Sequence, residues 1–359
     1  MIGTLFSKLK GSAKKQGRRV LILPSNIELM VEGDMTILEA AMESGVSYPY
    51  SCTVGTCGSC KTRLVEGKVS ALHDFAYTLD AQELAAGYIL ACQAIPKTDL
   101  IVEAPNVIER EIIKPEKFNG QISQVERLTH DIVRVSVELD RPMRYEAGQY
   151  ANLKPDFLDA PRSFSFVDAP DAEGCSNVSF FIRRVPGGAF TDWLFGQDRV
   201  GQRLDVEGPL GTFGLHKGQR TLLLIAGGSG LGPIKAILEQ AISERDRRNA
   251  ILFFGVRSQA DFYCLDELKE MQKRWGGRFD IVSVLSEETP EEGAEHQSGL
   301  VTDYVNIGTV RHGLNECQAY LCGPPAMVDA AIATLTAQGV PEDQIFFDKF
   351  LDQSHTPFS

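Results

Sequence analysis

The chain has 359 residues, of which 43% are hydrophobic and 23% are charged. This composition excludes a disordered protein, a collagen and a small disulfide-held scaffold, and the length suggests roughly two or three domains. Its 48 acidic residues outnumber its 36 basic ones, giving a formal net charge of -12, which argues against non-specific nucleic-acid binding because that binding needs surplus Lys and Arg.

The first part of the chain reads as a small α+β unit. Strand-like runs at 20–23 and 28–31 are joined by a short turn, which is a hairpin signal. Thr36 followed by Glu39 is a capping box that predicts the start of a helix, and Gly45 should end this helix.

The middle of the chain alternates apolar and polar residues with a period of two, which is typical of strands with one buried face. Turn residues recur between these runs, and no long helical pattern competes with them. The pattern therefore predicts a small antiparallel β-barrel. The expected strands lie at 121–125, 132–139, 150–153, 177–182 and 203–206.

The last part of the chain consists of apolar runs separated by helical stretches. Buried strands that alternate with helices predict a doubly wound parallel sheet. The expected strands lie at 221–226, 250–256, 279–285 and 318–322, and the expected helices lie at 233–247, 265–275 and 325–338. The expected division of the whole chain is a basic N-terminal segment at 1–17, domains at 18–107, 119–217 and 218–359, and a linker at 108–118.

Four of the eight cysteines lie within 41 residues, with the spacing C-x4-C-x2-C followed after 31 residues by the fourth. This is the plant-type spacing for a 2Fe-2S cluster, in which four thiolates hold two irons. Gly55 and Gly58 allow the loop to fold around the inorganic sulfurs and to point amides at them. Zinc is the alternative, but a zinc site prefers paired C-x2-C knuckles and the sequence has only one. The expected ligands are Cys52, Cys57, Cys60 and Cys92.

The surroundings of these cysteines resemble plant-type ferredoxin domains, through the lead-in Pro49-Tyr50-Ser51 and the tail Ala91-Cys92-Gln93. The resemblance implies a β-grasp fold for the first domain. Three further cysteines lack partners at ligand spacing and should be free thiols, namely Cys175, Cys264 and Cys317.

A second motif, Arg162-Ser163-Phe164-Ser165, lies on an expected barrel strand. It resembles the Arg-x-Tyr-Ser signature of the ferredoxin-reductase superfamily, which implies that these four residues bind FAD. Arg162 can pair with a flavin phosphate, Phe164 can cover the flavin ring, and Ser165 can hydrogen-bond near the redox nitrogen. Phe164 replaces the usual Tyr, which leaves the role of the missing hydroxyl open.

Gly187 and Gly188 come just before an expected short helix that has Thr191 in its first turn. Backbone amides in this arrangement can bind a pyrophosphate. The family resemblance places the FAD phosphates here and includes Arg183 among the residues that bind FAD. The alternative is an ordinary hairpin turn.

A glycine-rich turn at 227–233 joins an apolar strand to a helix, and such turns let backbone amides approach a dinucleotide pyrophosphate. Its form resembles the NAD(P) loop of the superfamily. The later Cys322-Gly323-Pro324 resembles the superfamily's Cys-Gly-Pro motif, which implies that Cys322 lies beside the nicotinamide carbon that donates hydride. The residues expected to bind the nucleotide are Gly228, Ser229, Gly230, Pro233, Cys322, Gly323 and Pro324.

Near the C-terminus, the resemblance implies that Asp348 lies close to the flavin in place of the usual Glu and that Phe350 covers the ring. With Ser165 and Cys322, Asp348 completes the expected catalytic residues. Arg257 follows the second strand of the last domain, where an acid typically favours NADH and an Arg can favour a 2′-phosphate. The reductases that this chain most resembles pair the same Gly-x-Arg with NADH, so we expect NADH.

The order of the three domains is that of the reductase components of multicomponent oxygenases, and the resemblance extends over essentially the whole chain. It is strongest toward the electron-transfer components of the xylene monooxygenase group, through runs such as Gly211-Thr-Phe-Gly-Leu-His216. It implies an oxidoreductase that takes a hydride from NADH onto FAD and passes single electrons through a 2Fe-2S cluster to a separate oxygenase.

The acceptor implied by the strongest resemblance is a membrane diiron hydroxylase that acts on alkyl-aromatic or related hydrocarbons. A soluble diiron or Rieske oxygenase is an alternative, as is a non-oxygenase such as a sugar-deoxygenation enzyme. A redox sensor without turnover is the non-enzyme alternative. The chain itself has no Glu-x-x-His pair for a diiron site.

The first 19 residues carry six basic residues and no acid, while Ile2, Leu5, Phe6 and Leu9 would share one face of a short helix. No run in the chain approaches the roughly 18–20 apolar residues of a membrane span, and no secretory signal is recognisable. We therefore expect a cytoplasmic protein whose N-terminal segment touches the inner face of the membrane near its partner. The alternative is a disordered solvated tail.

Overall fold

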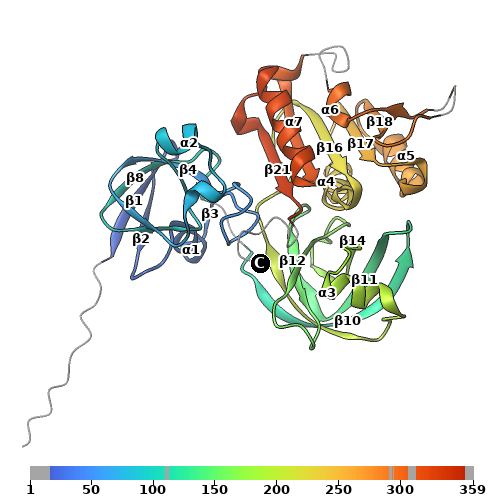
Figure 1. Ribbon diagram of the computed structural model, residues 1–359, viewed down its shortest axis with the longest axis horizontal. Helices are drawn as coiled ribbons and strands as arrows, with labels where there is room; N and C mark the ends of the chain where they lie inside the picture. The colour runs from blue at the N-terminus through green and yellow to red at the C-terminus, as the bar shows by residue number, and fades with distance from the viewer. Residues whose placement is uncertain (1–16, 110–112, 291–292, 294, 306–312, 352–359) are drawn as a thin grey trace, which may run out of the picture. The chain divides into compact units, whose positions relative to one another are not determined.

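The computed structural model describes residues 17–109, 113–290, 293, 295–305 and 313–351. The chain forms two compact units (Figure 1). The first unit comprises the residues up to 48 together with 61–110, and the second comprises Pro49–Cys60 together with 111–359. The expected boundaries between three domains remain a prediction.

The first unit is built on a mixed five-stranded sheet with the order β2-β1-β8-β4-β6, in which β1 and β8 run parallel. Thr36 caps α1, and both hydrogen bonds of the expected capping box with Glu39 are present. Apolar residues of α1 are buried, as expected for a β-grasp fold. The elements are β1 (Arg18–Leu23), β2 (Ile27–Val31), α1 (Ile37–Glu43), β3 (Val46–Ser47), β4 (Lys61–Glu66), β5 (Val69–Ala71), η1 (Phe75–Tyr77), α2 (Ala81–Ala85), β6 (Tyr88–Leu90), β7 (Ala94–Pro96), β8 (Leu100–Glu103) and β9 (Ile108–Glu109).

The second unit begins, after the loop Pro49–Cys60, with a six-stranded antiparallel sheet of order β13-β12-β15-β10-β11-β14. A bridge between Phe166 and Phe180 links the ends of this order, so the sheet closes into the expected barrel. Phe190 and Leu194 of α3 pack into its core. The elements are β10 (Glu116–Arg127), β11 (Ile132–Met143), β12 (Tyr150–Lys154), β13 (Arg162–Ser165), β14 (Cys175–Arg183), α3 (Ala189–Gly196) and β15 (Arg203–Leu210).

The rest of the second unit is an all-parallel sheet with the order β19-β18-β17-β16-β20-β21. Buried residues of α4 and α5 cover one face of the sheet and those of α7 cover the other, which confirms the doubly wound arrangement. The elements are β16 (Thr221–Gly227), η2 (Gly228–Gly230), α4 (Leu231–Ser243), β17 (Ala250–Val256), η3 (Gln259–Asp261), α5 (Leu265–Arg274), β18 (Phe279–Leu285), β19 (Gln297–Ser298), α6 (Val301–Tyr304), η4 (Leu314–Glu316), β20 (Cys317–Gly323), α7 (Pro325–Ala337), η5 (Glu342–Gln344) and β21 (Ile345–Lys349).

Several expected element bounds need correction. Two strands overlap the stretch expected as a linker: β9, which pairs with β3, and the start of β10 at Glu116. The helix expected at 233–247 begins earlier, at Leu231, since Pro233 is tolerated in a first turn where its missing N–H has no partner to lose. It ends earlier as well, because Arg245 adopts a left-handed conformation with φ +59°. The strand β21 was not expected.

A buried lysine joins the barrel to the parallel sheet within the second unit. Lys235 of α4 is 2% exposed, and its Nζ donates to Asp168 Oδ1 at 2.9 Å and to Glu239 Oε1 at 2.7 Å. Burial alone would lower the pKa of Lys235, but these two carboxylates outweigh burial and raise the pKa. The lysine therefore stays charged and fixes the helix that follows the glycine-rich turn against the barrel.

Candidate functional site

The loop Pro49–Cys60 directs backbone amides at its cysteine sulfurs. The amides of Cys52 and Ser59 each donate to Cys57 Sγ at 3.4 Å, and the amide of Thr56 donates to Cys52 Sγ at the same distance. Such bonds stabilise the thiolate form that iron requires. The loop therefore has the donor set expected of a cluster-binding loop.

Two glycines shape this loop. Gly55 and Gly58 adopt φ values of +83° and +79°, in the left-handed region that favours glycine. A hydrogen bond with Cys57, followed by bonds from Thr56, lowers the pKa of the Cys52 thiol to about 5 despite its burial. Of the two hydrogen-bonded thiols, Cys52 and Cys57, Cys52 therefore loses its proton readily. A cysteine must be in this thiolate form to bind a metal.

The other two expected ligands are also buried. Cys60 ends the loop and is 1% exposed, while Cys92 follows β6 in the first unit and is 4% exposed. The side-chain amide of Gln93 donates to Cys92 Sγ at 3.7 Å. The assignment of these four cysteines as the ligands of one cluster remains a prediction.

A cavity of about 320 Å³, here called the first cavity, lies in the second unit. Its wall includes the cluster loop itself, through Cys52 and Cys57, and residues of β12, β13, β14 and β21. Seven of the residues expected at the flavin or the nucleotide line it, namely Ser163, Phe164, Ser165, Arg183, Ser229, Asp348 and Phe350.

Two of the expected catalytic residues meet in the first cavity. Ser165 Oγ donates to Asp348 Oδ2 at 3.4 Å, although the two residues are 183 positions apart. Burial raises the pKa of Asp348 to about 7, against the opposing effect of hydrogen bonds from Ser51 and Ser165. The cavity thus contains a carboxyl that can exchange a proton near neutral pH.

The third expected catalytic residue lies elsewhere. Cys322 pairs with Asp348 in the register of β20 and β21, but it is fully buried and lines neither this cavity nor the one described below. Burial raises the pKa of its thiol well above the usual value. Its expected place beside a nicotinamide remains a prediction.

Four of the residues expected to bind FAD lie outside the first cavity. Arg162 donates to the carbonyl oxygens of Ala160 and Pro161, at 3.1 and 3.0 Å. The Gly187 amide donates to Asp192 Oδ2 at 3.1 Å, so a carboxylate already occupies it. Thr191 Oγ1 donates within its own loop, to the carbonyl oxygens of Val185 and Gly188.

A second cavity, also of about 320 Å³, lies at the carboxyl ends of the parallel strands. Ligands of doubly wound sheets bind at these ends. Arg183 lines both cavities. The other expected residues that line the second cavity are Gly228, Arg257 and Pro324.

The glycine-rich turn owes its shape to close packing. A Cβ on Gly230 would overlap the Cys322 carbonyl group, and one on Gly227 would overlap the Met327 sulfur. Gly228 adopts φ +53° and is the first residue of η2, which leads directly into α4. Gly230, Pro233 and Gly323 do not line the second cavity.

The structure also brings in residues that sequence patterns did not single out. Tyr150 and Asn152 of β12 line the first cavity, whereas Asp131 and Asp261 line the second. Tyr150 faces Ser165 in the strand register, so the pairing of β12 with β13 could have indicated it. No local motif marks the two aspartates.

The local chemistry fits the cofactors that the sequence implies. Amides point at the sulfurs of the cluster loop. Neither α3 nor α4 has a side-chain cap at its N-cap residue, which leaves amides of both first turns for a phosphate, although Asp192 Oδ2 accepts the Gly187 amide just before α3.

Three family models match the chain in succession. The 2Fe-2S iron-sulfur cluster binding domain matches residues 20–97, the oxidoreductase FAD-binding domain matches 119–215, and the oxidoreductase NAD-binding domain matches 224–332. The first match favours an iron–sulfur cluster over zinc. The three cofactors are therefore a 2Fe-2S cluster, FAD and NAD.

Relatives match over almost the whole chain. The xylene/toluene monooxygenase electron transfer component XylA of Pseudomonas putida is 40% identical over 334 residues, which cover 93% of this chain and 94% of that protein. The phenol 2-monooxygenase reductase component DmpP of Pseudomonas sp. strain CF600 is 34% identical, with coverage of 92% and 94%. The solved structure of the Amycolatopsis cytochrome P450 reductase GcoB is 33% identical, with a TM-score of 0.74 and coverage of 93% and 98%. The chain belongs to the family of iron–sulfur flavoprotein reductases that serve as components of multicomponent oxygenases.

Proposed function

We propose that this protein takes a hydride from NADH onto FAD and passes the electrons singly, through a 2Fe-2S cluster, to a separate oxygenase. The observation that carries this proposal is the first cavity, whose wall combines Cys52 and Cys57 of the cluster loop with Ser165 and Asp348. FAD supplies the chemistry that joins a two-electron donor to a one-electron carrier.

The residues of this chain have separate tasks in the proposal. Ser165 and Asp348 would hold a proton beside the flavin, and Arg183, which lines both cavities, would bind negative charge between them. Phe350 would cover the flavin ring, because its amide is tied to the Gly323 carbonyl at 2.9 Å while its side chain lines the first cavity. Cys52, Cys57, Cys60 and Cys92 would hold the cluster.

The proposed activity predicts rapid reduction of one-electron acceptors. Mixing the purified protein, loaded with FAD and its cluster, with NADH and cytochrome c or ferricyanide should give acceptor reduction that saturates with NADH. The rates can be followed by acceptor absorbance. A holoprotein that binds partners in a redox-dependent way but turns over no NADH would instead be a redox sensor.

For the electron acceptor, we propose a membrane-bound diiron hydroxylase that oxidises alkyl-aromatic or related hydrocarbons. The 40% identity to the xylene/toluene monooxygenase component supports this choice. Reductase components of phenol and propane monooxygenases and of a naphthalene dioxygenase system match at 32–34% identity. Electron transfer from the reductase to one purified hydroxylase of each type, measured as substrate-dependent NADH consumption, would rank these acceptors, and equal or higher rates with another type would reject the proposal.

The first 16 residues lie outside the described part of the chain, and no helix within that part is long and apolar enough to cross a membrane. We propose that the basic N-terminal segment binds anionic lipid, since apolar and basic side chains interleave in it. Deleting residues 2–17 should reduce co-sedimentation with vesicles that contain anionic lipid but not with neutral vesicles. Equal binding by the full chain and the truncated chain would reject the proposal.

A further inference from the structure

Arg257 lies where the second cavity meets the carboxyl end of β17. It directly follows this strand, the position from which an Arg commonly binds the 2′-phosphate of NADP and an acid commonly binds the free ribose hydroxyl of NAD. On its own, an arginine here would favour NADPH. The side chains around it reverse that expectation.

Two carboxylates hold the Arg257 guanidinium. One of its terminal nitrogens donates to Asp131 Oδ2 at 2.9 Å and lies 3.5 Å from Asp261 Oδ1. The Asp131 and Asp261 side chains are 18% and 9% exposed, whereas that of Arg257 is 46% exposed. The two acids are thus the less hydrated partners, and their carboxylates hold the more exposed guanidinium.

Both carboxylates are themselves fixed by hydrogen bonds to their other oxygen atoms. Thr129 Oγ1 donates to Asp131 Oδ1 at 3.1 Å, which leaves Oδ2 for the arginine. The amide and the hydroxyl of Ser258 both donate to Asp261 Oδ2 at 3.0 Å, so Oδ1 faces the arginine and His130. Because both carboxylates are already fixed, holding Arg257 in place costs little additional conformational entropy.

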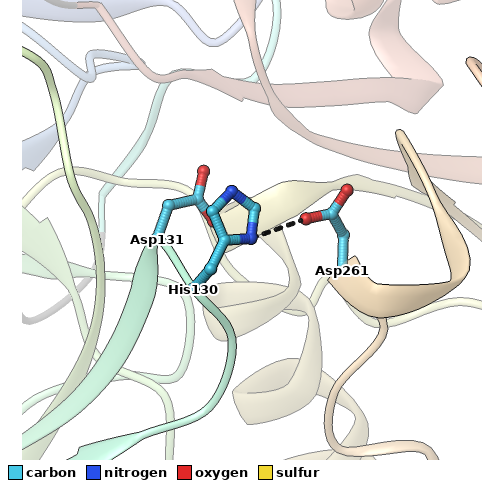
Figure 2. A group of neighbouring side chains, drawn as sticks. All are labelled: His130, Asp131 and Asp261. Carbon is cyan, nitrogen blue, oxygen red and sulfur yellow. Dashed lines mark ion pairs between the residues drawn. The ribbon is translucent and has the colours of Figure 1, made fainter.

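The same aspartates could suggest a metal site. Ligand atoms of His130, Asp131 and Asp261 lie within 4.8 Å of one another, and Figure 2 shows the His130 ring directed at Asp261, whose Oδ1 lies 3.3 Å from Nδ1. However, the Arg257 guanidinium already supplies a cation to both carboxylates, and a metal ion would have to displace it. His130 is also 64% exposed. The cluster is therefore better explained as a holder for Arg257.

We propose that Asp131, acting with Asp261 through Arg257, makes this reductase select NADH over NADPH. The two carboxylates and the Arg257 guanidinium sum to one negative charge, and Arg183, which also lines this cavity, offsets that charge. The 2′-phosphate carries about −1.5 to −2 charges and would compete with Asp131 for Arg257. Arg257 can bind the 2′-phosphate of NADPH only after its bond to Asp131 is broken, whereas the free hydroxyl of NADH leaves that bond intact. The inference rests on the proposed function, and it places a determinant of nucleotide choice in the barrel, outside the NAD-binding domain.

The test compares Asp131→Asn with the unchanged holoprotein. Removing this charge releases Arg257, so the ratio of kcat/KM for NADPH to that for NADH should rise about tenfold. Calorimetric binding of adenosine 2′,5′-bisphosphate relative to adenosine 5′-monophosphate should rise to a similar extent, independently of turnover. The matched control is Asp140→Asn, which removes an acid that also pairs with an arginine, on β11 of the same barrel, but lines neither cavity. It should leave both ratios unchanged.

The role of Arg257 is tested in an Arg257→Gln background. If Asp131 acts through this arginine, Asp131→Asn should change neither ratio there. The inference is rejected if Asp131→Asn leaves the ratios within about twofold of the unchanged protein, or if its effect persists without Arg257. If the Asp131→Asn protein still oxidises NADH but its ratios are unchanged, only the role of Asp131 is rejected. If the unchanged holoprotein does not oxidise NADH, the proposed function is rejected as well.

Discussion

Replacing Cys57 with serine should lower NADH-dependent cytochrome c reduction by roughly 100-fold or more, because even residues that only support a metal ligand commonly contribute 10–100-fold. Cys57 is 1% exposed, and its sulfur accepts the amides of Cys52 and Ser59 at 3.4 Å each. A serine oxygen is a poor ligand for iron. Because the Cβ–O bond is shorter than the Cβ–S bond, the oxygen would also not keep both amide contacts. The visible absorbance of the cluster should be lost together with the activity.

A matched control is available in the barrel. Cys175 also accepts a backbone amide, that of Asp171, at 3.3 Å, but it lies outside the cluster loop. Cys175→Ser makes the same chemical change to a similar contact and should retain both cluster absorbance and cytochrome c reduction. If Cys57→Ser kept its iron and its activity, Cys57 would not be a ligand and the proposed electron route would be wrong.

Features determined by neighbouring residues were predictable from the sequence. The bond between Thr36 and Glu39 spans three positions, and the capping box appears as expected. The glycine-rich turn joins β16 to α4, as expected. It was predictable because its glycines and the apolar run before it are signals that neighbouring residues carry. The period-two pattern likewise predicted the barrel strands.

Features that depend on distant residues were not predictable in this way. Asp131 follows an ordinary strand, and only the folded chain places it beside Arg257, 126 positions later. The strand β21 is short and contains two charged residues, so its apolar pattern is weak, although five of its residues pair with β20. A single sequence gives patterns along the chain, whereas a cavity joins side chains from several strands.

Asp348→Asn should stabilise the second unit above neutral pH, because the buried carboxylate of Asp348 destabilises the folded state there. Burial raises the pKa of Asp348 to about 7, whereas the unfolded chain would titrate near 3.9. Between about pH 4 and pH 7, the folded protein keeps a proton that the unfolded chain has released. The contribution of Asp348 to the free energy of unfolding therefore falls as the pH rises through this window and is constant above it. The total loss is about 4 kcal/mol.

Asparagine cannot ionise but can still accept the hydrogen bond from Ser165, so the variant avoids this loss. Its stability advantage over the unchanged protein should be small near pH 4, grow up to pH 7 and then level off at about 2–4 kcal/mol. The two tryptophans, Trp193 and Trp275, both lie in the second unit, so their fluorescence reports its urea unfolding at each pH. Asp205→Asn, which changes a carboxyl that is 69% exposed, is the control and should give a difference that varies little with pH.

A stability difference that does not change between pH 4 and pH 8, or that decreases with pH, would show that Asp348 is not the group that burial perturbs. The expected result would instead separate two roles of one residue. Ser165 and Asp348 face the first cavity together, so a carboxyl that destabilises the fold above neutral pH would support the catalytic role proposed for it there. The same Asp348→Asn protein should then oxidise NADH more slowly while unfolding at a higher urea concentration, and a fall in both properties would assign the residue a structural role only.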